Sequence, residues 1–212
     1  MLALALAGGC VDVISYIGLG KVFTANMTGN TVLLAVALVK GTGADAARSA
    51  VALGGFSVGV AIGLLLIAPG HVPWPRRARR ALLFELIALI ALLVLWAAIG
   101  VHTIRYPLIA IGGIAMGSQS AAVRASDVRG VNTTYMTSTL LNAIAGAVQR
   151  LRDTPGKVEN GPSLPGAAWL TYGAGALIGG FAVNTWNAGA VAIALASVAA
   201  VCLPLRPSAT PS

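Results

Sequence analysis

Long stretches without a charged side chain constrain this chain more than any other feature. Charged residues make up 9% of the sequence and hydrophobic residues 57%, and the mean hydropathy is +0.85. Soluble domains carry about 25% charged residues, so a soluble fold would leave much of this apolar surface in water. A lipid bilayer is the solvent that suits such a surface. The sequence therefore predicts an all-α fold, a polytopic transmembrane helix bundle.

Eight apolar segments follow one another along the chain. They are Leu2–Leu19, Thr28–Val39, Ala50–Ala68, Ala81–Gly100, Pro107–Val123, Thr133–Val148, Ala167–Val183 and Ala188–Leu203. A full crossing needs about 20 residues, and the third, fourth, fifth, seventh and eighth segments fit that length. The first is interpreted as a membrane helix because its apolar character continues past Asp12.

The second and sixth segments differ from the others because both open with polar residues. The openings are residues 24–31 (TANMTGNT) and 132–139 (NTTYMTST), and about three apolar turns follow each. A shift of 109 positions superimposes the two openings and also places Gly8 on Gly117. We therefore expect one membrane domain, 1–212, with an internal repeat over about 1–100 and 105–205.

The basic residues distinguish two possible topologies. If all eight segments cross, seven basic residues lie on each side of the membrane. If the second and sixth segments are re-entrant, ten lie on one side and four on the other, namely Lys21, Lys40, Arg48 and Arg105. Because basic residues accumulate on the cytoplasmic side, the second topology is favoured. It has about six full spans, two short re-entrant helices, two inverted repeats and both termini in the cytoplasm.

One stretch of the sequence resembles a known family. The run GCVDVISY (9–16), followed by GKVFTANMTGN (20–30), is similar to the opening of the YoaK family of bacterial inner-membrane proteins. The resemblance covers nearly the whole chain, and its most specific part is Phe23–Asn30. It implies about six spans and a place in the bacterial inner (plasma) membrane. The family is one of unknown function, so the resemblance implies no activity.

Asp12 is the most informative single residue because it lies well inside the first apolar segment. A carboxylate at that depth must be paired, solvated or protonated. One interpretation is a proton or cation site. The other is a buried carboxyl that caps the re-entrant loop through hydrogen bonds. Tyr16, one helical turn away, is a candidate hydrogen-bond partner.

The two polar openings form the second candidate site. Half-helices that meet near the middle of the membrane are the arrangement that transporters use to bind solutes. The alternative is that these side chains hydrogen-bond between helices and only hold the bundle together. The candidate residues are Asn26, Thr28, Gly29 and Asn30 in the first half, and Thr133, Thr137 and Asn142 in the second.

Three further polar residues lie inside apolar segments. Ser118 and Gln119 occupy a place in the fifth segment that matches Asp12 in the first. They are expected either to line the same cavity or to join helices. Glu85 follows Arg80 by five positions, and we expect it to contact Arg80 or to reach the membrane interface.

No motif points to an enzyme, a metal site or a cofactor, and there is no basic face for nucleic acid. Both cysteines, Cys10 and Cys202, lie in apolar segments and are interpreted as small buried side chains. The expected partners are the lipid bilayer and a small-molecule solute, with a homo-oligomer left open. The function predicted first is a small permease or channel for a small polar or anionic solute. The alternatives are a scaffold or partner-binding subunit without transport activity and, last, an intramembrane enzyme.

Overall fold

The regular structure of the protein is helical throughout the described residues. The computed structural model describes residues 1–68, 74, 76–126, 136–151 and 163–202. The helices are α1 (Leu2–Gly18), α2 (Met27–Val39), α3 (Gly43–Leu66), α4 (Arg79–Ile99), α5 (Val101–Arg124), α6 (Met136–Leu151), α7 (Ser163–Trp186), a short 3₁₀ helix η1 (Asn187–Ala190) and α8 (Val191–Cys202). These ranges contain no strand, which confirms the predicted all-α class.

The apolar helices are long enough for a membrane in only some cases. By length and composition, α3, α4 and the 39-residue helical stretch Leu164–Cys202 qualify among the described residues. Helix α1 is short at 17 residues, and α5, though 24 residues long, has a more polar sequence. Apolar side chains such as Leu65 and Phe181 lie on the outer surface, where lipid would cover them. The count of six spans stays a prediction.

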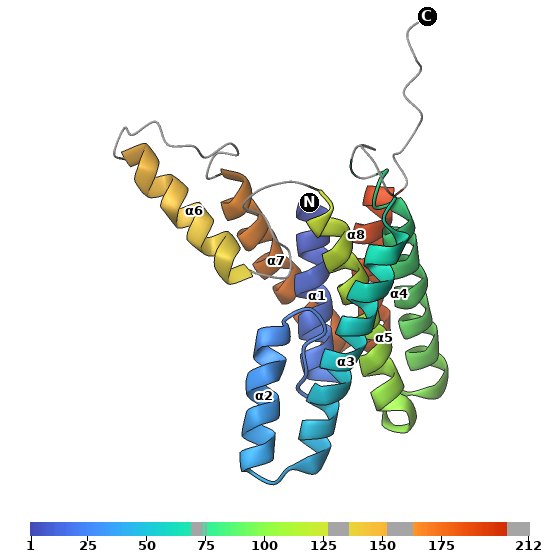
Figure 1. The fold of residues 1–212 in the computed structure, drawn as a ribbon. Helices are drawn as coiled ribbons and strands as arrows, with labels where there is room; N and C mark the ends of the chain where they lie inside the picture. Colours follow the sequence, from blue (N-terminus) through green and yellow to red (C-terminus); the bar gives the residue numbers. More distant parts are fainter. Residues whose placement is uncertain (69–73, 75, 127–135, 152–162, 203–212) are drawn as a thin grey trace, which may run out of the picture.

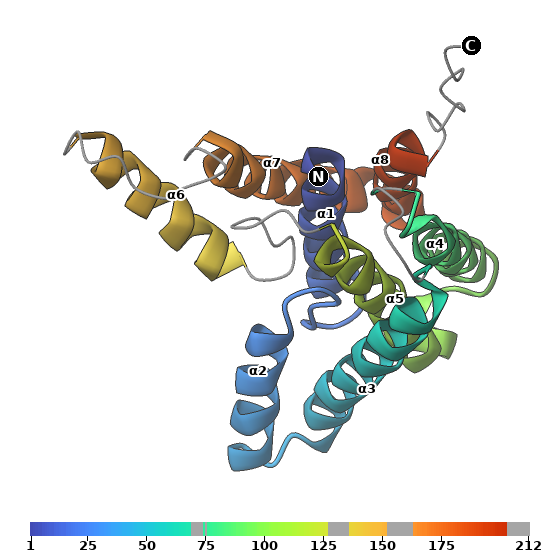
Figure 2. The ribbon, with the colours of Figure 1, turned by 45° about the horizontal axis from the view of Figure 1, so that its top comes forward.

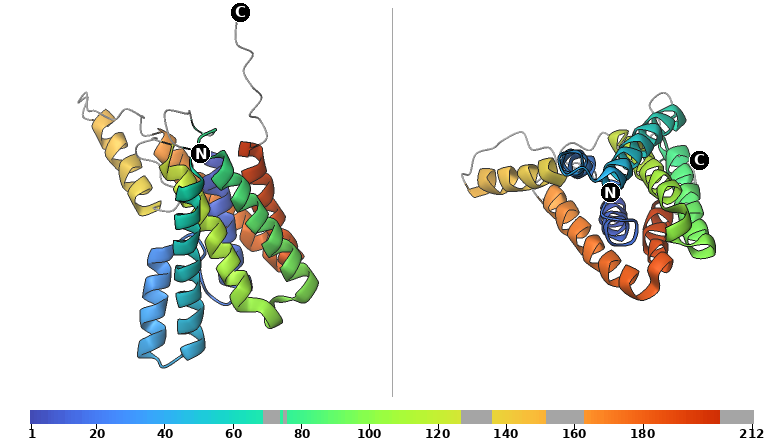
Figure 3. Two further views of the ribbon diagram at one scale, coloured as in Figure 1. Left: turned by 45° about the vertical axis from the view of Figure 1, so that its right-hand side comes forward. Right: turned by 90° about the horizontal axis from the view of Figure 1, so that it is seen from below.

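The helices run up and down around α1, which lies near the centre of the bundle (Figure 3). Helices α2 and α6 lie on one side, with α2 in the lower half of the molecule and α6 in the upper half (Figure 1). They remain apart from one another when the molecule is tilted (Figure 2). Their first residues face the middle level of the bundle and their last residues lie at opposite ends. The start of α1 and the end of α8 lie at the same end (Figure 1).

Glycine allows two pairs of helices to cross closely. The two most extensive helix pairs are α3 with α5 and α1 with α7. A Cβ atom on Gly59 of α3 would overlap the carbonyl oxygen of Ile114 in α5. Likewise, a Cβ atom on Gly175 of α7 would overlap the carbonyl oxygen of Leu6 in α1. Each half therefore packs its third helix against the first helix of the other half, through backbone contact that small residues permit.

The same crossings relate the two halves by a shift that is one position smaller than the shift of 109 positions found in the sequence. Gly117 of α5 lies against Phe56 of α3, and Gly9 of α1 lies against Tyr172 of α7 in the same way. The contacts thus match Gly9 with Gly117, whereas the sequence shift matched Gly8. The duplication itself stays a prediction. A duplicated chain would be expected to repeat its helix contacts in this way.

Candidate functional site

Asp12 joins α1 to the segment that leads into α2. Its carboxylate is buried, and its Oδ1 atom accepts hydrogen bonds from the backbone N–H groups of Thr24 (2.8 Å), Ala25 (2.6 Å) and Asn26 (3.3 Å). The Oδ2 atom accepts a hydrogen bond of 2.6 Å from the hydroxyl of Tyr172 in α7. One carboxylate therefore ties three parts of the chain together. Charged acceptors of this kind form the stronger class of hydrogen bond.

The start of α2 is fixed by further side-chain hydrogen bonds. Asn26 is the N-cap residue, and its side-chain oxygen accepts from the N–H of Gly29 at 3.1 Å. The buried side chain of Asn30 binds both backbone groups of Phe23, accepting from its N–H (3.0 Å) and donating to its carbonyl (2.6 Å). The polar opening of the second segment is thus an ordered turn with a conventional helix cap.

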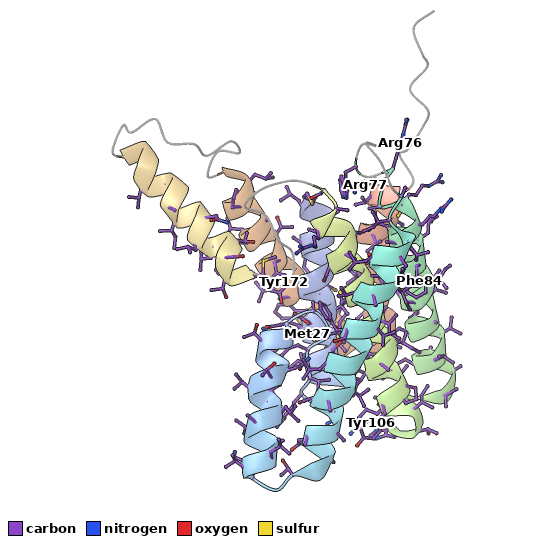
Figure 4. The ribbon with its side chains drawn as sticks, viewed as in Figure 1. Met27, Arg76, Arg77, Phe84, Tyr106 and Tyr172 are labelled. Atoms are coloured by element: carbon purple, nitrogen blue, oxygen red, sulfur yellow. The ribbon has the colours of Figure 1, made fainter. Side chains whose placement is uncertain are left out.

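A cavity of about 750 Å³ lies between the starts of α2 and α6. Figure 4 places Tyr172 near the start of α2, where Met27 lies. The wall combines polar and apolar side chains from α1, α2, α6, α7 and the turn before α2. The lining residues are Asp12, Ala25, Asn26, Thr28, Gly29, Val32, Met136, Thr137, Ser138, Leu141 and Tyr172. Asp12 is the one charged residue among the described residues of this wall.

Five of the residues that the sequence selected line this cavity together. They are Asp12, Asn26, Thr28, Gly29 and Thr137. Thr28 and Thr137 are exposed to the cavity from α2 and α6, which are on opposite halves of the chain. The described polar residues at the starts of the two short helices therefore face one space.

Other selected residues lie elsewhere. Asn30 is buried behind the turn, as described above. Tyr16 stacks on Phe23 with ring centroids 5.1 Å apart and does not bind Asp12. Asn142 is exposed on α6 but does not line the cavity. Thr133 falls outside the described residues.

Ser118 and Gln119 join helices and do not line the cavity. The hydroxyl of Ser118 donates to the carbonyl of Ala81 in α4 at 2.9 Å. The side-chain amide of Gln119 donates to the carbonyl of Leu4 in α1 at 2.8 Å. Of the two interpretations given for these residues, contact between helices is the one that the geometry favours.

The prediction for Glu85 was wrong, and the role of Tyr172 was missed. Glu85 does not contact Arg80 or reach the interface, since it is fully buried and its carboxylate receives no hydrogen bond from the described residues. Tyr172 was missed as the partner of Asp12. Its position, three residues before Gly175, places it on the helix face that packs against α1. That spacing was a signal in the sequence, because Gly175 and Gly179 are four residues apart in the seventh segment, a spacing of small residues that is typical of closely packed membrane helices.

An all-helical bundle with an apolar outer surface and a buried polar site defines an integral membrane protein. The chain belongs to the family described as "Protein of unknown function (DUF1275)", which matches residues 1–204. It is also 36% identical over 152 residues to the "UPF0700 transmembrane protein YoaK" of Bacillus subtilis (strain 168). That match covers 70% of this chain and 66% of the relative. The resemblance to the YoaK family is thereby confirmed. No solved structure matches the chain.

Proposed function

We propose that the protein is a small permease or channel and that its solute binds in the cavity between α2 and α6. The observation that carries the proposal is the shared wall, to which Asn26 and Thr28 from one half and Thr137 from the other contribute. Short helices that begin near the middle of a membrane and face a common space are a recurrent basis for solute sites in transporters. Hydroxyl and amide groups on such a wall can replace part of the hydration of a polar solute.

The lining favours an uncharged polar solute over the anion that the sequence also allowed. The three N–H groups of residues 24–26, which an anion would otherwise attract, already bind the Asp12 carboxylate. A second negative charge beside this carboxylate would be repelled. Apolar residues such as Val32 and Leu141 complete the wall. A small neutral molecule with hydroxyl or amide groups fits this mixture.

The end of the bundle where α4 begins is proposed to face the cytoplasm of a bacterial cell, with the chain in the plasma (inner) membrane. Arg76 and Arg77 lie at this end (Figure 4), next to the start of α4 at Arg79 and the end of α5 at Arg124. The opposite end holds Lys40, which follows α2. By the positive-inside pattern, we propose that the start of α1 and the end of α8 face the cytoplasm.

A scaffold without transport activity is the second candidate. It is favoured by the polar groups that satisfy one another inside the bundle, including the hydroxyls of Ser15 and Thr24, which lie 3.1 Å apart. A protein that only holds its helices together needs such bonds. It has no need of a cavity lined by exposed hydroxyls, so solute binding distinguishes the two candidates.

Ligand-dependent stability of the purified protein tests the proposal. Wild-type protein in detergent is heated with a panel of small polyols, amides, sugars, nucleobases and, for comparison, anions. A solute at about 100 times its dissociation constant should stabilise the folded protein by about 2.7 kcal/mol. Transport of the solute that stabilises is then measured in liposomes.

Matched variants make the result specific to the cavity. Thr28→Val and Thr137→Val each remove one hydroxyl from the wall and should weaken the stabilisation. Thr31→Val is the control, because the Thr31 hydroxyl is on the same helix but donates to the carbonyl of Met27 outside the cavity. This variant should keep the stabilisation by the solute. A panel without any stabilising solute, or a stabilisation that survives both wall variants, would contradict the proposal and favour the scaffold.

A further inference from the structure

Glu85 is a second acidic group inside the bundle, and it is away from the cavity. It lies on the buried face of α4, with no exposed surface, and it does not line the cavity. It is the seventh residue of the helix, which places it about 9 Å from the helix start at 1.5 Å per residue. Neither of its carboxyl oxygens receives a hydrogen bond from the described residues. This is the opposite of Asp12, whose two oxygens accept four hydrogen bonds.

Within the part of the chain that the structure describes, the surroundings of Glu85 offer little to neutralise a negative charge. The elements packed against α4 are α3, α5, η1 and α8. Among the buried residues of these four elements, Cys202 of α8 is the one titratable side chain. Cys202 lies within electrostatic range of both Glu85 and Arg79. Arg79 itself is exposed at the start of α4 and forms no ion pair with Glu85.

We propose that Glu85 is a proton-binding site of this protein. An unpaired carboxylate in an apolar interior is strongly disfavoured, and the neutral acid removes that charge without a partner side chain. In the binding step, a hydronium ion at the end of the bundle where α4 begins gives up a proton and becomes water. One of its O–H bonds breaks, and a new O–H bond forms with one carboxyl oxygen of Glu85. The charge on Glu85 falls from −1 to 0, and no electron is transferred. The inference does not rest on the proposed function, because it needs neither the cavity nor a solute.

Infrared spectroscopy of the purified protein detects the proton directly. At neutral pH, wild type should show the C=O stretch of a protonated carboxylic acid, and the band should shift when the protein is moved into D₂O. Glu85→Gln should remove the band, since the amide keeps the shape and lacks the acid. Asp45→Asn is the matched control, because it removes an exposed carboxylate that is paired with Arg48, and it should leave the band unchanged.

Thermal unfolding at a series of pH values gives a second readout. The folded protein holds the proton, while the unfolded chain releases it to water as the pH rises. Wild type should therefore lose thermal stability with rising pH, and Glu85→Gln should lose this part of the pH dependence. At acidic pH the two proteins should unfold at similar temperatures.

Several outcomes would overturn the proposal. One is the absence of an acid band in wild type, and another is a band that persists in Glu85→Gln. Stabilisation of wild type by sodium or potassium ions that is lost in Glu85→Gln would assign the site to a metal cation instead. If Glu85→Gln does not fold, Glu85→Asp keeps the acid and should move the band. A band that does not move would show that another residue produces it.

Discussion

At the scale of single residues, the site depends on one carboxylate with partners near and far in the sequence. Asp12 binds the N–H groups of residues 24–26, within 14 positions, and the hydroxyl of Tyr172, 160 positions away. The near partners hold the turn before α2. The far partner joins this turn to α7, so the cavity wall is held from two directions. Asp12 thus acts first as a positioning residue for the groups that face the cavity.

Tyr172→Phe should lower the free energy of unfolding by about 1–2 kcal/mol. It removes only the hydroxyl, and it leaves a buried charged acceptor with one partner fewer. Chemical or thermal unfolding in detergent measures the loss. Tyr16→Phe is the control, because the Tyr16 hydroxyl makes no hydrogen bond within the described part of the chain. Equal losses in the two variants would contradict the hydrogen bond to Asp12.

The choice between these two tyrosines also shows what the sequence could tell about the site. The polar openings and Asp12 stand out because such residues are rare in apolar segments, so their meeting at one cavity was predictable. Tyr16 was chosen as the partner because it is a local neighbour on the same helix. Tyr172 reaches Asp12 through the crossing of α1 and α7, and the register of that crossing depends on packing between distant segments.

At the scale of helices, the crossings depend on glycine at a few positions only. Gly59 and Gly175 are in backbone contact with the facing helix, whereas Gly54 and Gly173 have open space where a Cβ atom would lie. The apolar runs predicted that the helices exist, but they did not predict the residue at which each helix begins. The first turns of α3 contain polar residues, Asp45 and Arg48 among them. A hydrophobicity criterion therefore began this helix at Ala50, seven residues late.

Gly59→Ala and Gly175→Ala should each lower the free energy of unfolding by about 1–3 kcal/mol, because the added methyl group forces the backbones apart. Gly54→Ala and Gly173→Ala make the same change on the same two helices without a clash. They should be neutral or raise stability slightly through the lower entropy of the unfolded chain. Unfolding curves of the four variants measure the contrast. A uniform response would contradict the predicted role of these contacts.

At the scale of the whole molecule, the two halves are interlocked. The first helix of each half packs against the third helix of the other, so neither half has a complete core alone. Helices α2 and α6 end at opposite ends of the bundle (Figure 1). The two helices thus run in opposite directions, as expected for the inverted repeats that the count of basic residues favoured. The six full spans stay a prediction, and α1 and α5 do not meet the length and composition of a simple crossing.

Cysteine labelling from each side of the membrane tests this topology. Cys10 and Cys202 are first replaced by alanine, and Lys40→Cys or Arg150→Cys is then introduced. An impermeant thiol reagent should reach position 40 from the periplasmic or outer side and position 150 from the cytoplasmic side. Arg76→Cys should behave as Arg150→Cys does. Labelling of positions 40 and 150 from the same side would refute the inverted arrangement.

The long reach from Asp12 to Tyr172 has a consequence for synthesis of the protein. At 5–20 residues per second, the ribosome needs roughly 8–32 s to add the 160 residues between them. The N–H groups of residues 24–26 are synthesised much sooner, so they are the first partners available to the carboxylate of Asp12. Asp12 is thus partly shielded while most of the chain is still being made. A nascent chain that stops before α7 lacks the hydroxyl that donates to Oδ2 of Asp12, so this oxygen must find another partner or take up a proton.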